Sequence, residues 1–451
     1  MQDRRGNPVS TASATALDAA EQAMWRMMSF YGTPEADLDA ALAADPAWAE
    51  PVLMKAGFLL SLTEPSVLPD ARALLDGVQA RQSTLIDRER RHLHALQLLI
   101  AGDWLGACNA WEALLLQHPR DVLALHWAHL FDFYRGDAVN LRQRVARVLP
   151  EWDAADALHP YVLGLYAFGL EENQLYAEAE ATGREALAMA NVPWAMHAVA
   201  HVMEMEGRHQ DGSAWMQRWR ADWALGNGFA GHLGWHHALF ALERLDHAAA
   251  LHIFDEHLAA DPAQITLQRI DAAALLWRVQ LLGGPVGERW QQLVAGWPMP
   301  DGVAGRFPFN DLHALLALLG SGDVARADAW LHQAARHADN AVEGPRALAS
   351  EVALPLMRGL LAFARGDFDR AVHHLSPVRA QTHRVGGSHA QRDLIDQTLI
   401  AASVRSSEPA VARALLNERR LAKPITPLTA HWLSRLPAPL DPTGDRSHAH
   451  P

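Results

Sequence analysis

The chain has 451 residues, half of them hydrophobic and a fifth charged, so it can bury a large core and is not an intrinsically disordered polymer. Its formal net charge of −13 and the lack of any basic block exclude nucleic-acid binding through phosphate neutralisation. A single cysteine, Cys108, excludes an intramolecular disulfide and a thiolate metal cluster. Because Cys108 lies in an apolar helical stretch, we interpret it as a core residue and not as a nucleophile.

The N-terminus carries two arginines but no apolar core run, so it does not resemble a secretory signal. No stretch of about twenty uncharged apolar residues follows, so the sequence predicts no membrane-spanning helix. We therefore expect a soluble, cytoplasmic protein. We assign residues 1–20 to an N-terminal extension, 21–436 to one helical repeat domain and 437–451 to a disordered tail.

Internal repetition is the strongest signal in the chain. A tetratricopeptide unit is about 34 residues long, and its second helix carries a small residue, then an aromatic residue, then a closing proline at fixed intervals. Three segments keep these intervals, the middle one with weaker residue types. They contain Ala107, Trp111 and Pro119; Ala179, Gly183 and Asn191; and Ala250, Phe254 and Pro262.

Four turns of one form join the predicted helices, each with a glycine that can end one helix and an aspartate that can cap the next. Because each hairpin buries its apolar faces only against its neighbours, the sequence predicts an all-α solenoid of tetratricopeptide-type helical hairpins, a right-handed superhelix with a concave inner face. The glycine- and proline-rich stretch 283–311 predicts a long loop or an irregular repeat. The turns are AGDW at 101–104, RGDA at 135–138, SGDV at 321–324 and RGDF at 365–368.

One predicted helix carries polar residues where the repeat normally has apolar ones. His197, His201 and Glu204 recur at i, i+4 and i+7, so they share the face that packs against other helices. Burying such groups without partners costs about 1–3 kcal/mol each. They must therefore bond to one another or to a bound molecule.

Polar residues in other predicted helices extend this pattern. His232 and His236 repeat the i, i+4 spacing in the first helix of the next hairpin. Because successive first helices lie side by side, we expect these groups to converge into one polar pocket. For Gln391, Arg392 and Asp393, the competing interpretation is an arginine–aspartate brace between helices. The further candidates are His129, then Asn310, Asp311 and His313, then Gln391, Arg392 and Asp393.

A structural network and a functional site are equally open interpretations of the His197, His201 and Glu204 set. A single buried histidine is more often a core residue bonded to a carbonyl. The spacing H-x-x-x-H is that of helical zinc ligands, so His197, His201 and His236 are candidate ligands of a divalent metal such as zinc. The metalloprotease motif is absent, because Ala198 and not glutamate follows His197.

Several long segments carry a further signal: HPYVLGLYAFGLEENQLYAEAE, MHAVAHVMEMEGRHQDG, HLGWHHALFALERLDHAAALHIFDEHL, PFNDLHALLAL, GGSHAQRDLIDQTLIAA and ARALLNERRLAKPITPLTAHWL. Together they resemble the tetratricopeptide repeat protein 38 family, in order from about residue 20 to residue 436. The resemblance implies a single helical-repeat protein in the cytoplasm but no particular activity. It singles out the same polar residues, except His129 and His232.

Two functions are compatible with these patterns. The first is a binding protein whose enclosed His/Glu-rich pocket holds a small polar ligand or a peptide end. The second is an enzyme that uses the pocket for metal-assisted or acid/base hydrolysis, with Glu204 as the catalytic base. Clustered histidines and glutamates, in place of a basic groove lining, favour an enclosed site. We expect neither a nucleic acid nor a membrane as partner.

Overall fold

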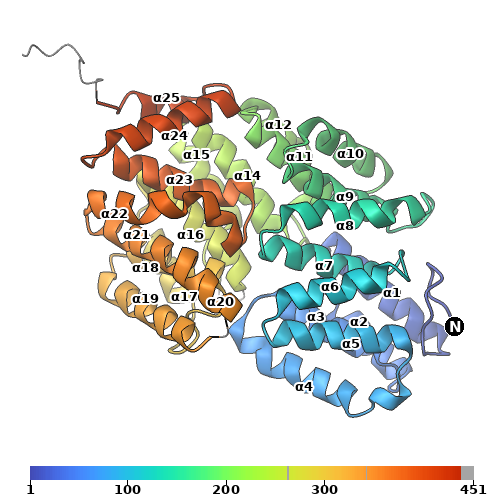
Figure 1. The fold of residues 1–451 in the computed structure, drawn as a ribbon. Helices are drawn as coiled ribbons and strands as arrows, with labels where there is room; N and C mark the ends of the chain where they lie inside the picture. Colours follow the sequence, from blue (N-terminus) through green and yellow to red (C-terminus); the bar gives the residue numbers. More distant parts are fainter. Residues whose placement is uncertain (262–263, 342, 438–451) are drawn as a thin grey trace, which may run out of the picture.

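The structure is a computed structural model that describes residues 1–261, 264–341 and 343–437 (Figure 1). Its elements are helices joined by turns, and the described residues contain no β-strand, only two isolated bridges. The predicted all-α fold class is therefore confirmed. Of the predicted tail at 437–451, every residue after Pro437 lies outside the described part of the chain.

The N-terminal half begins with α1, which is capped by Ser13 and starts before the predicted domain boundary at residue 21. The segment before it is packed, because Arg5 forms a buried ion pair with Glu21 at 2.8 Å. The elements of this half are α1 (Ala14–Ser29), α2 (Glu35–Ala44), α3 (Glu50–Ser61), η1 (Pro65–Val67), α4 (Leu68–Gln79), η2 (Gln82–Thr84), α5 (Asp87–Ile100), α6 (Trp104–Leu115), α7 (Val122–Tyr134), α8 (Ala138–Val148), η3 (Leu149–Glu151), α9 (His159–Glu171), α10 (Tyr176–Met189), α11 (Pro193–Met205), α12 (His209–Arg218) and α13 (Arg220–Trp223).

The C-terminal half continues the array with one irregular unit. The stretch 283–311, predicted as a loop or an irregular repeat, contains the short helix α17 and a non-helical connection to α18. The elements of this half are α14 (Ala230–Glu243), α15 (His247–His257), α16 (Thr266–Leu281), α17 (Arg289–Gly296), α18 (Pro308–Gly320), α19 (Val324–Asp339), α20 (Glu343–Leu348), the π-helical η4 (Ala349–Ala353), α21 (Leu354–Ala364), α22 (Phe368–Leu375), η5 (Ser376–Val385), α23 (His389–Ser403), α24 (Pro409–Ala422) and α25 (Pro427–Leu433).

Helices that follow one another pack as hairpins, and the second helix of each hairpin also packs on the first helix of the next. A repeat array whose members contact only their neighbours buries a continuous core in this way. The apolar residues that the sequence places on two faces of each helix supply that core. The hairpins are α1/α2, α3/α4, α5/α6, α7/α8, α9/α10, α11/α12, α14/α15, α16/α17, α18/α19, α21/α22 and α23/α24.

The four predicted turns have the expected geometry. Their glycines all adopt positive φ, from 67° at Gly136 to 89° at Gly102. The aspartate after each glycine accepts a backbone N–H from the first turn of the following helix. Positive φ is costly for residues with a Cβ atom, and the cap satisfies one of the free N–H groups at a helix start. The turn that follows α14 uses Leu245 at φ 61° in place of glycine, before the capping Asp246.

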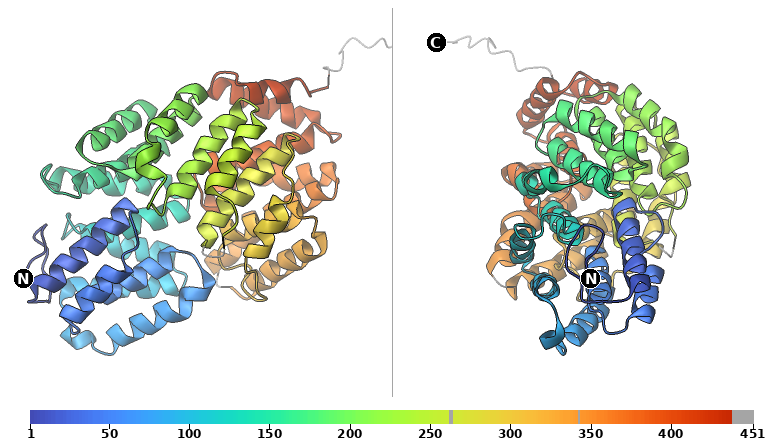
Figure 2. Two further views of the ribbon diagram at one scale, coloured as in Figure 1. Left: turned by 180° about the vertical axis from the view of Figure 1, so that it is seen from behind. Right: turned by 90° about the vertical axis from the view of Figure 1, so that its right-hand side faces the viewer.

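The superhelix closes on itself, so the predicted concave face is filled and not an open groove. Helix α23, far along the chain, packs against α11 as well as α16 (Figures 1 and 2). Side chains bridge the two halves: Asn310 Nδ2 donates to Thr63 Oγ1 at 3.0 Å, and the His389 backbone N–H donates to Glu172 Oε1 at 2.9 Å. The curvature of the array therefore brings distant repeats into direct contact.

One helical stretch, Gly344–Ala364, is long and apolar enough to cross a membrane by length and composition alone. Core helices of soluble proteins pass the same test. Half of its apolar window is buried inside the protein, and its α21 part packs against α18, α19 and α22. These contacts are those of a core helix.

The closure depends on a turn in which only glycine can be accommodated. A Cβ atom on Gly136 would fall on the backbone carbonyl of His383, in η5, and Gly136 has φ 67°. Gly136→Ala is therefore expected to lower the free energy of unfolding by at least about 3 kcal/mol, since backbone strain and a backbone clash add. Gly366→Ala is the matched control, because Gly366 has φ 77° but no atom within 4 Å of a Cβ. The control is expected to cost about 1 kcal/mol. Denaturant unfolding measures both, and equal losses would show that the closure contributes nothing.

Candidate metal centre

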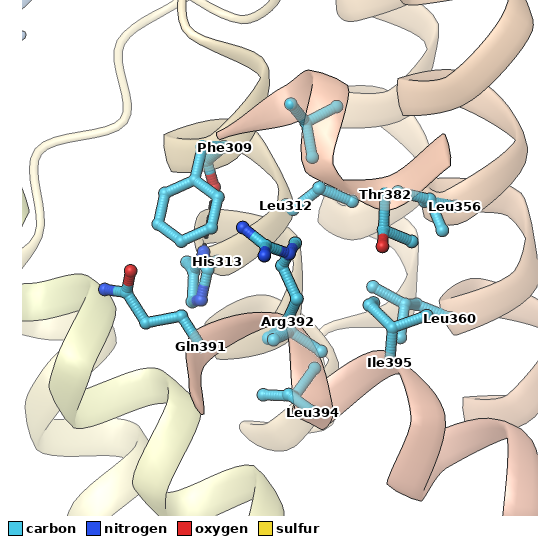
Figure 3. A pocket seen from close by; sticks show the side chains of 12 residues that line it. Phe309, Leu312, His313, Leu356, Leu360, Thr382, Gln391, Arg392, Leu394 and Ile395 are labelled. Carbon is cyan, nitrogen blue, oxygen red and sulfur yellow. Dashed lines mark hydrogen bonds between the residues drawn. The ribbon is translucent and has the colours of Figure 1, made fainter. Parts of the chain in front are cut away.

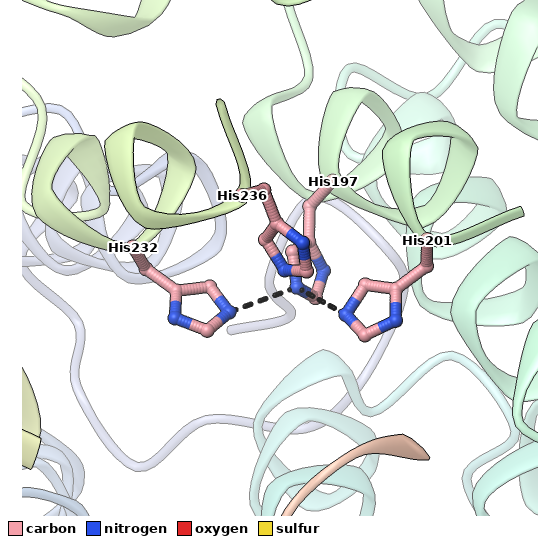
Figure 4. Close-up of side chains that lie close together, drawn as sticks. All are labelled: His197, His201, His232 and His236. Atoms are coloured by element: carbon pink, nitrogen blue, oxygen red, sulfur yellow. Dashed lines mark hydrogen bonds between the residues drawn. The ribbon is translucent and has the colours of Figure 1, made fainter. Parts of the chain in front are cut away.

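Helices α11 and α14 bring four histidines together in the interior of the protein (Figure 4). Helix α11 carries His197 and His201 one turn apart, and α14 carries His232 and His236 in the same way. The ring centroids of His201 and His236, on different helices, lie 4.4 Å apart. The two i, i+4 pairs that stand out in the sequence therefore form one cluster across the contact between the helices.

Ring nitrogens of the four imidazoles converge on one centre. His197 Nε2 lies 2.9 Å from His201 Nε2 and 3.0 Å from His232 Nε2. His236 Nε2 is buried and has no hydrogen-bond partner among the described residues. One nitrogen from each ring lies within 4.8 Å of the other three. This is the arrangement of four donor atoms around a common point.

Three of the four histidines have a carboxylate behind the ring nitrogen that faces away from the centre. A carboxylate that accepts the Nδ1–H proton fixes the tautomer and leaves the Nε2 lone pair directed inward. The distance between His201 and Glu171 is too long for a hydrogen bond, but the carboxylate of Glu171 still lies behind the ring. The pairs are His232 Nδ1–Asp271 Oδ2 at 2.8 Å, His236 Nδ1–Glu204 Oε2 at 3.2 Å and His201 Nδ1–Glu171 Oε2 at 3.6 Å.

These lone pairs create an electrostatic conflict that a cation resolves. His197 Nε2 is within hydrogen-bond distance of both His201 and His232, but a neutral ring has only one proton at Nε2. That proton can serve only one of the two contacts, so the other brings two ring nitrogens together without a hydrogen bond unless a further ring becomes charged. Burial lowers the pKa of His197, His201 and His236 well below the usual histidine range, so charging a ring is costly.

Protein side chains enclose the centre. His197, His201 and His236 are at most 2% exposed, whereas the His232 side chain is 15% exposed. Aromatic rings cover the cluster, with centroids about 5 Å from those of the imidazoles. The Phe168 ring lies 5.1 Å from His197 and 5.4 Å from His201. Trp194 lies 5.2 Å from His197. Phe229 lies 4.9 Å from His232, and Trp235 lies 4.8 Å from His236. The exposed edge of His232 is thus the open side of the cluster.

The residues present are suited to a divalent transition metal ion. Neutral imidazoles bind zinc, copper, iron and nickel, and a carboxylate behind the ligand is the usual second partner of a metal-bound histidine. Zinc–nitrogen bonds of 2.0–2.1 Å in a tetrahedron place the nitrogens about 3.3–3.4 Å apart. The two closest pairs, at 2.9 and 3.0 Å, need to open by only a few tenths of an ångström.

Glu204 acts on the cluster from behind His236 and not from the centre. Burial raises the pKa of Glu204 to about 8, against the opposing effect of Lys423. Lys423 Nζ donates to the backbone carbonyl of Glu204 at 3.2 Å. In this position Glu204 orients a histidine, which differs from the role of general base predicted for an enzyme.

Three predicted site residues have partners outside the cluster. The His129 ring packs against Trp194, one of the aromatic residues that cover the cluster, but its Nε2 is 3.0 Å from the Leu165 carbonyl. Asn310 bonds to Thr63, and Asp311 Oδ2 accepts the Gly305 backbone N–H at 2.8 Å. These polar groups therefore hold the backbone where repeats meet, and none has a described contact with the four histidines.

A second group of predicted residues surrounds a small cavity of about 20 Å³ between α18, α21 and α23 (Figure 3). His313 and Gln391 lie at one side of it, next to Phe309, and leucines form much of the rest. His313 Nδ1 is 2.8 Å from the Phe309 carbonyl, and the Gln391 side chain closes the capping box of α23. A space of this size holds about one water molecule, so it is not a pocket for a larger ligand.

Arg392 and Asp393 form braces between helices. Arg392 Nη2 pairs at 3.3 Å with Oε2 of Glu172, the residue that follows α9, and its Nη1 donates to the Gly387 carbonyl. Asp393 pairs with Arg419 of α24. The competing interpretation given above for these residues, an arginine–aspartate brace, describes Asp393 directly.

Two carboxylates of the cluster were not among the predicted residues. Asp271 is a buried carboxylate in LQRIDAAALLWR of α16, directly before an apolar run, and Glu171 ends α9. Asp271 is a polar residue in the first helix of the next hairpin, which is the same signal that identified the histidines. Glu171 lies next to a turn, where a glutamate is usually exposed to solvent, so its sequence position carries no such signal.

Cys108 is a buried core residue, as predicted. Its side chain is not exposed, and its Sγ lies 3.8 Å from the Ala128 carbonyl. Burial raises the pKa of the thiol far above the usual range, so it stays protonated. It takes no part in the histidine cluster.

No protein-family model matches the chain. Among solved structures it is similar to a tetratricopeptide repeat protein from Parabacteroides merdae, with 13% sequence identity and a TM-score of 0.30, over 69% of this chain and 98% of that one. A similarity this weak adds no argument of its own. By its own hairpin packing and turn geometry, this chain is a tetratricopeptide-like helical repeat protein.

Proposed function

We propose that this protein binds one divalent transition metal ion, most simply Zn²⁺, through His197, His201, His232 and His236. The observation that carries the proposal is the order of groups: four inward ring nitrogens, with a carboxylate behind three of them. A histidine that only fills a core needs one carbonyl, as His129 has, and no such shell. The sequence motifs also support membership of the tetratricopeptide repeat protein 38 family as a proposal.

The metal ion would serve to hold a small polar ligand. Four neutral imidazoles leave the double positive charge of the ion uncompensated by its direct ligands, which favours an anionic or strongly polar molecule as a further ligand. The exposed edge of His232 is the side from which such a molecule would arrive. The filled inner face of the superhelix favours a small ligand over a peptide.

Metal-assisted hydrolysis is the second candidate. A bound ion lowers the pKa of a coordinated water and generates hydroxide near neutral pH. Catalytic zinc sites usually have three protein ligands and one open position. His232 is the most exposed of the four, so it is the ligand whose replacement by water would open the site.

Metal content of the purified protein tests the proposal. Elemental analysis is expected to find at least one equivalent of zinc, iron, copper or nickel per chain. After chelation, adding Zn²⁺ at 100 times its dissociation constant should stabilise the fold by about 2.7 kcal/mol, because the ion binds only the folded site. Cobalt(II) should give the visible absorption of a four-nitrogen site. Protein without metal, and without a melting shift or cobalt band, would exclude the proposed function.

A further inference from the structure

A second cluster of metal-binding side chains lies on the outer side of His201. Glu171 is the last residue of α9, Glu172 follows it, and His389 is the first residue of α23. One donor atom from each of the three lies within 4.8 Å of the others. His389 is 217 positions from Glu172 in the sequence, so only the closure of the superhelix brings it to the two glutamates.

Glu171 is the unusual member of this cluster. Its side chain is fully buried, and neither carboxylate oxygen has a hydrogen-bond partner among the described residues. The nearest cationic candidates are imidazoles: His201 Nδ1 at 3.6 Å from Oε2 and His389 Nδ1 at 3.8 Å from Oε1. Charge-assisted hydrogen bonds are about 2.7–2.9 Å long, so neither contact is one.

The local charge also calls for a cation. Both carboxylates are at the C-terminus of α9, where the backbone dipole is negative, and anions are disfavoured there. Arg392 pairs with Glu172 Oε2 and not with Glu171, so among the described residues Glu171 has no ion pair with an arginine or a lysine. An uncompensated buried carboxylate costs several kcal/mol.

The spacing of the donor atoms leaves room for an ion. His389 Nδ1 lies 3.8 Å from Glu171 Oε1 and 3.7 Å from Glu172 Oε1. A triangle with these two sides and a third side of up to 4.8 Å has a circumscribed circle of radius at most about 2.4 Å, close to the 2.0–2.2 Å bonds that zinc makes to nitrogen and oxygen. His389 Nδ1 is buried and has no hydrogen bond among the described residues, so it can serve as a ligand once it has lost its proton.

We propose that Glu171, Glu172 and His389 form a second divalent cation site, distinct from the four-histidine site. Two carboxylates and one imidazole suit Zn²⁺ or Mn²⁺, and three protein ligands leave coordination positions for water. Glu171 joins the two sites, because its other oxygen faces His201. The His389 side chain, 21% exposed, gives the site access to solvent.

The rival occupant is a proton on His389, which would turn the cluster into an ion-pair brace between α9 and α23. His389→Lys separates the two. Lysine supplies a permanent positive charge, so it preserves a brace but removes the ligand. The backbone N–H at position 389, which bonds to Glu172, remains in this variant. Glu172→Gln is a second variant that removes a charged ligand and retains a side-chain oxygen to accept that N–H.

Metal stoichiometry, measured by equilibrium dialysis with Zn²⁺ and with Mn²⁺, tests the second site. The wild-type chain is expected to bind two equivalents of Zn²⁺. His389→Lys and Glu172→Gln should each bind one equivalent, at the four-histidine site. His197→Phe should also bind one equivalent, at the second site. If wild type binds one equivalent that His197→Phe loses and His389→Lys keeps, the second site is excluded and the first stands. If His389→Lys loses the single equivalent and His197→Phe keeps it, the second site stands and the proposed function fails. Wild-type protein that binds no metal would exclude both.

Discussion

Replacing His197 by phenylalanine is expected to lower the affinity of the four-histidine site for Zn²⁺ by at least about 100-fold. Loss of a residue behind a ligand already costs about 10–100-fold, and His197 would be a direct ligand. It is also the central ring, within 3.0 Å of two other Nε2 atoms. Competition with a chromophoric chelator measures the loss.

The same substitution should leave the metal-free fold nearly as stable as the wild type. Phenylalanine fills the space of the imidazole, and His197 is surrounded by Phe168, Trp194 and Phe229. Replacing a poorly satisfied buried polar group by an apolar one of similar shape is close to neutral. His197 Nδ1 has no hydrogen-bond partner among the described residues, so no second group is left unpaired on that side.

His129→Phe is the matched control. His129 is as buried as His197 and lies against the same Trp194 ring, but its Nε2 faces the Leu165 carbonyl. This variant should keep wild-type Zn²⁺ affinity and lose about 1–3 kcal/mol of stability through the unpaired carbonyl. Equal metal affinity in the two variants would contradict the four-histidine site.

The repeat fold could be predicted because its signals are local. A glycine followed by an aspartate, as at Gly102 and Asp103, ends one helix and caps the next within a few residues of sequence. The closure could not be predicted in this way. The contact of α23 with α11 depends on the sum of many small rotations between hairpins, to which every packed side chain contributes.

The candidate site, like the fold, could be predicted only in part from the sequence. His197, His201, His232 and His236 stand out because two helices each repeat one spacing, and neighbouring helices in the array must touch. Asn310 and Gln391 have comparable sequence signals, yet they bond to Thr63 and to the backbone of Ser388. A polar residue on a packed face predicts that a partner exists, and only the tertiary structure determines which one.

Glu204→Gln separates a structural histidine network from a metal site. Glutamine keeps the shape of the side chain and can still accept the Nδ1–H of His236, but it cannot become an anion when a cation binds. If the cluster binds a metal, Zn²⁺ affinity should fall by about 10–100-fold, because a neutral acceptor makes His236 a weaker ligand. The metal-free protein should melt at the same temperature or higher, because a buried carboxylate that accepts a single hydrogen bond is costly to keep ionised.

Glu243→Gln is the control with the opposite expectation. Glu243 is on α14, as buried as Glu204, and its Oε1 pairs with Lys423 and Arg419, each at 3.2 Å. Neutralising it leaves two buried cations with less compensation, so stability should fall by about 3–5 kcal/mol while Zn²⁺ affinity stays at the wild-type value. Melting curves in chelator and a competitive Zn²⁺ titration on both variants give the two readouts. If Glu204→Gln instead behaves like this control, losing stability and keeping its metal affinity, then Glu204 is a structural acceptor and the histidines form a core network.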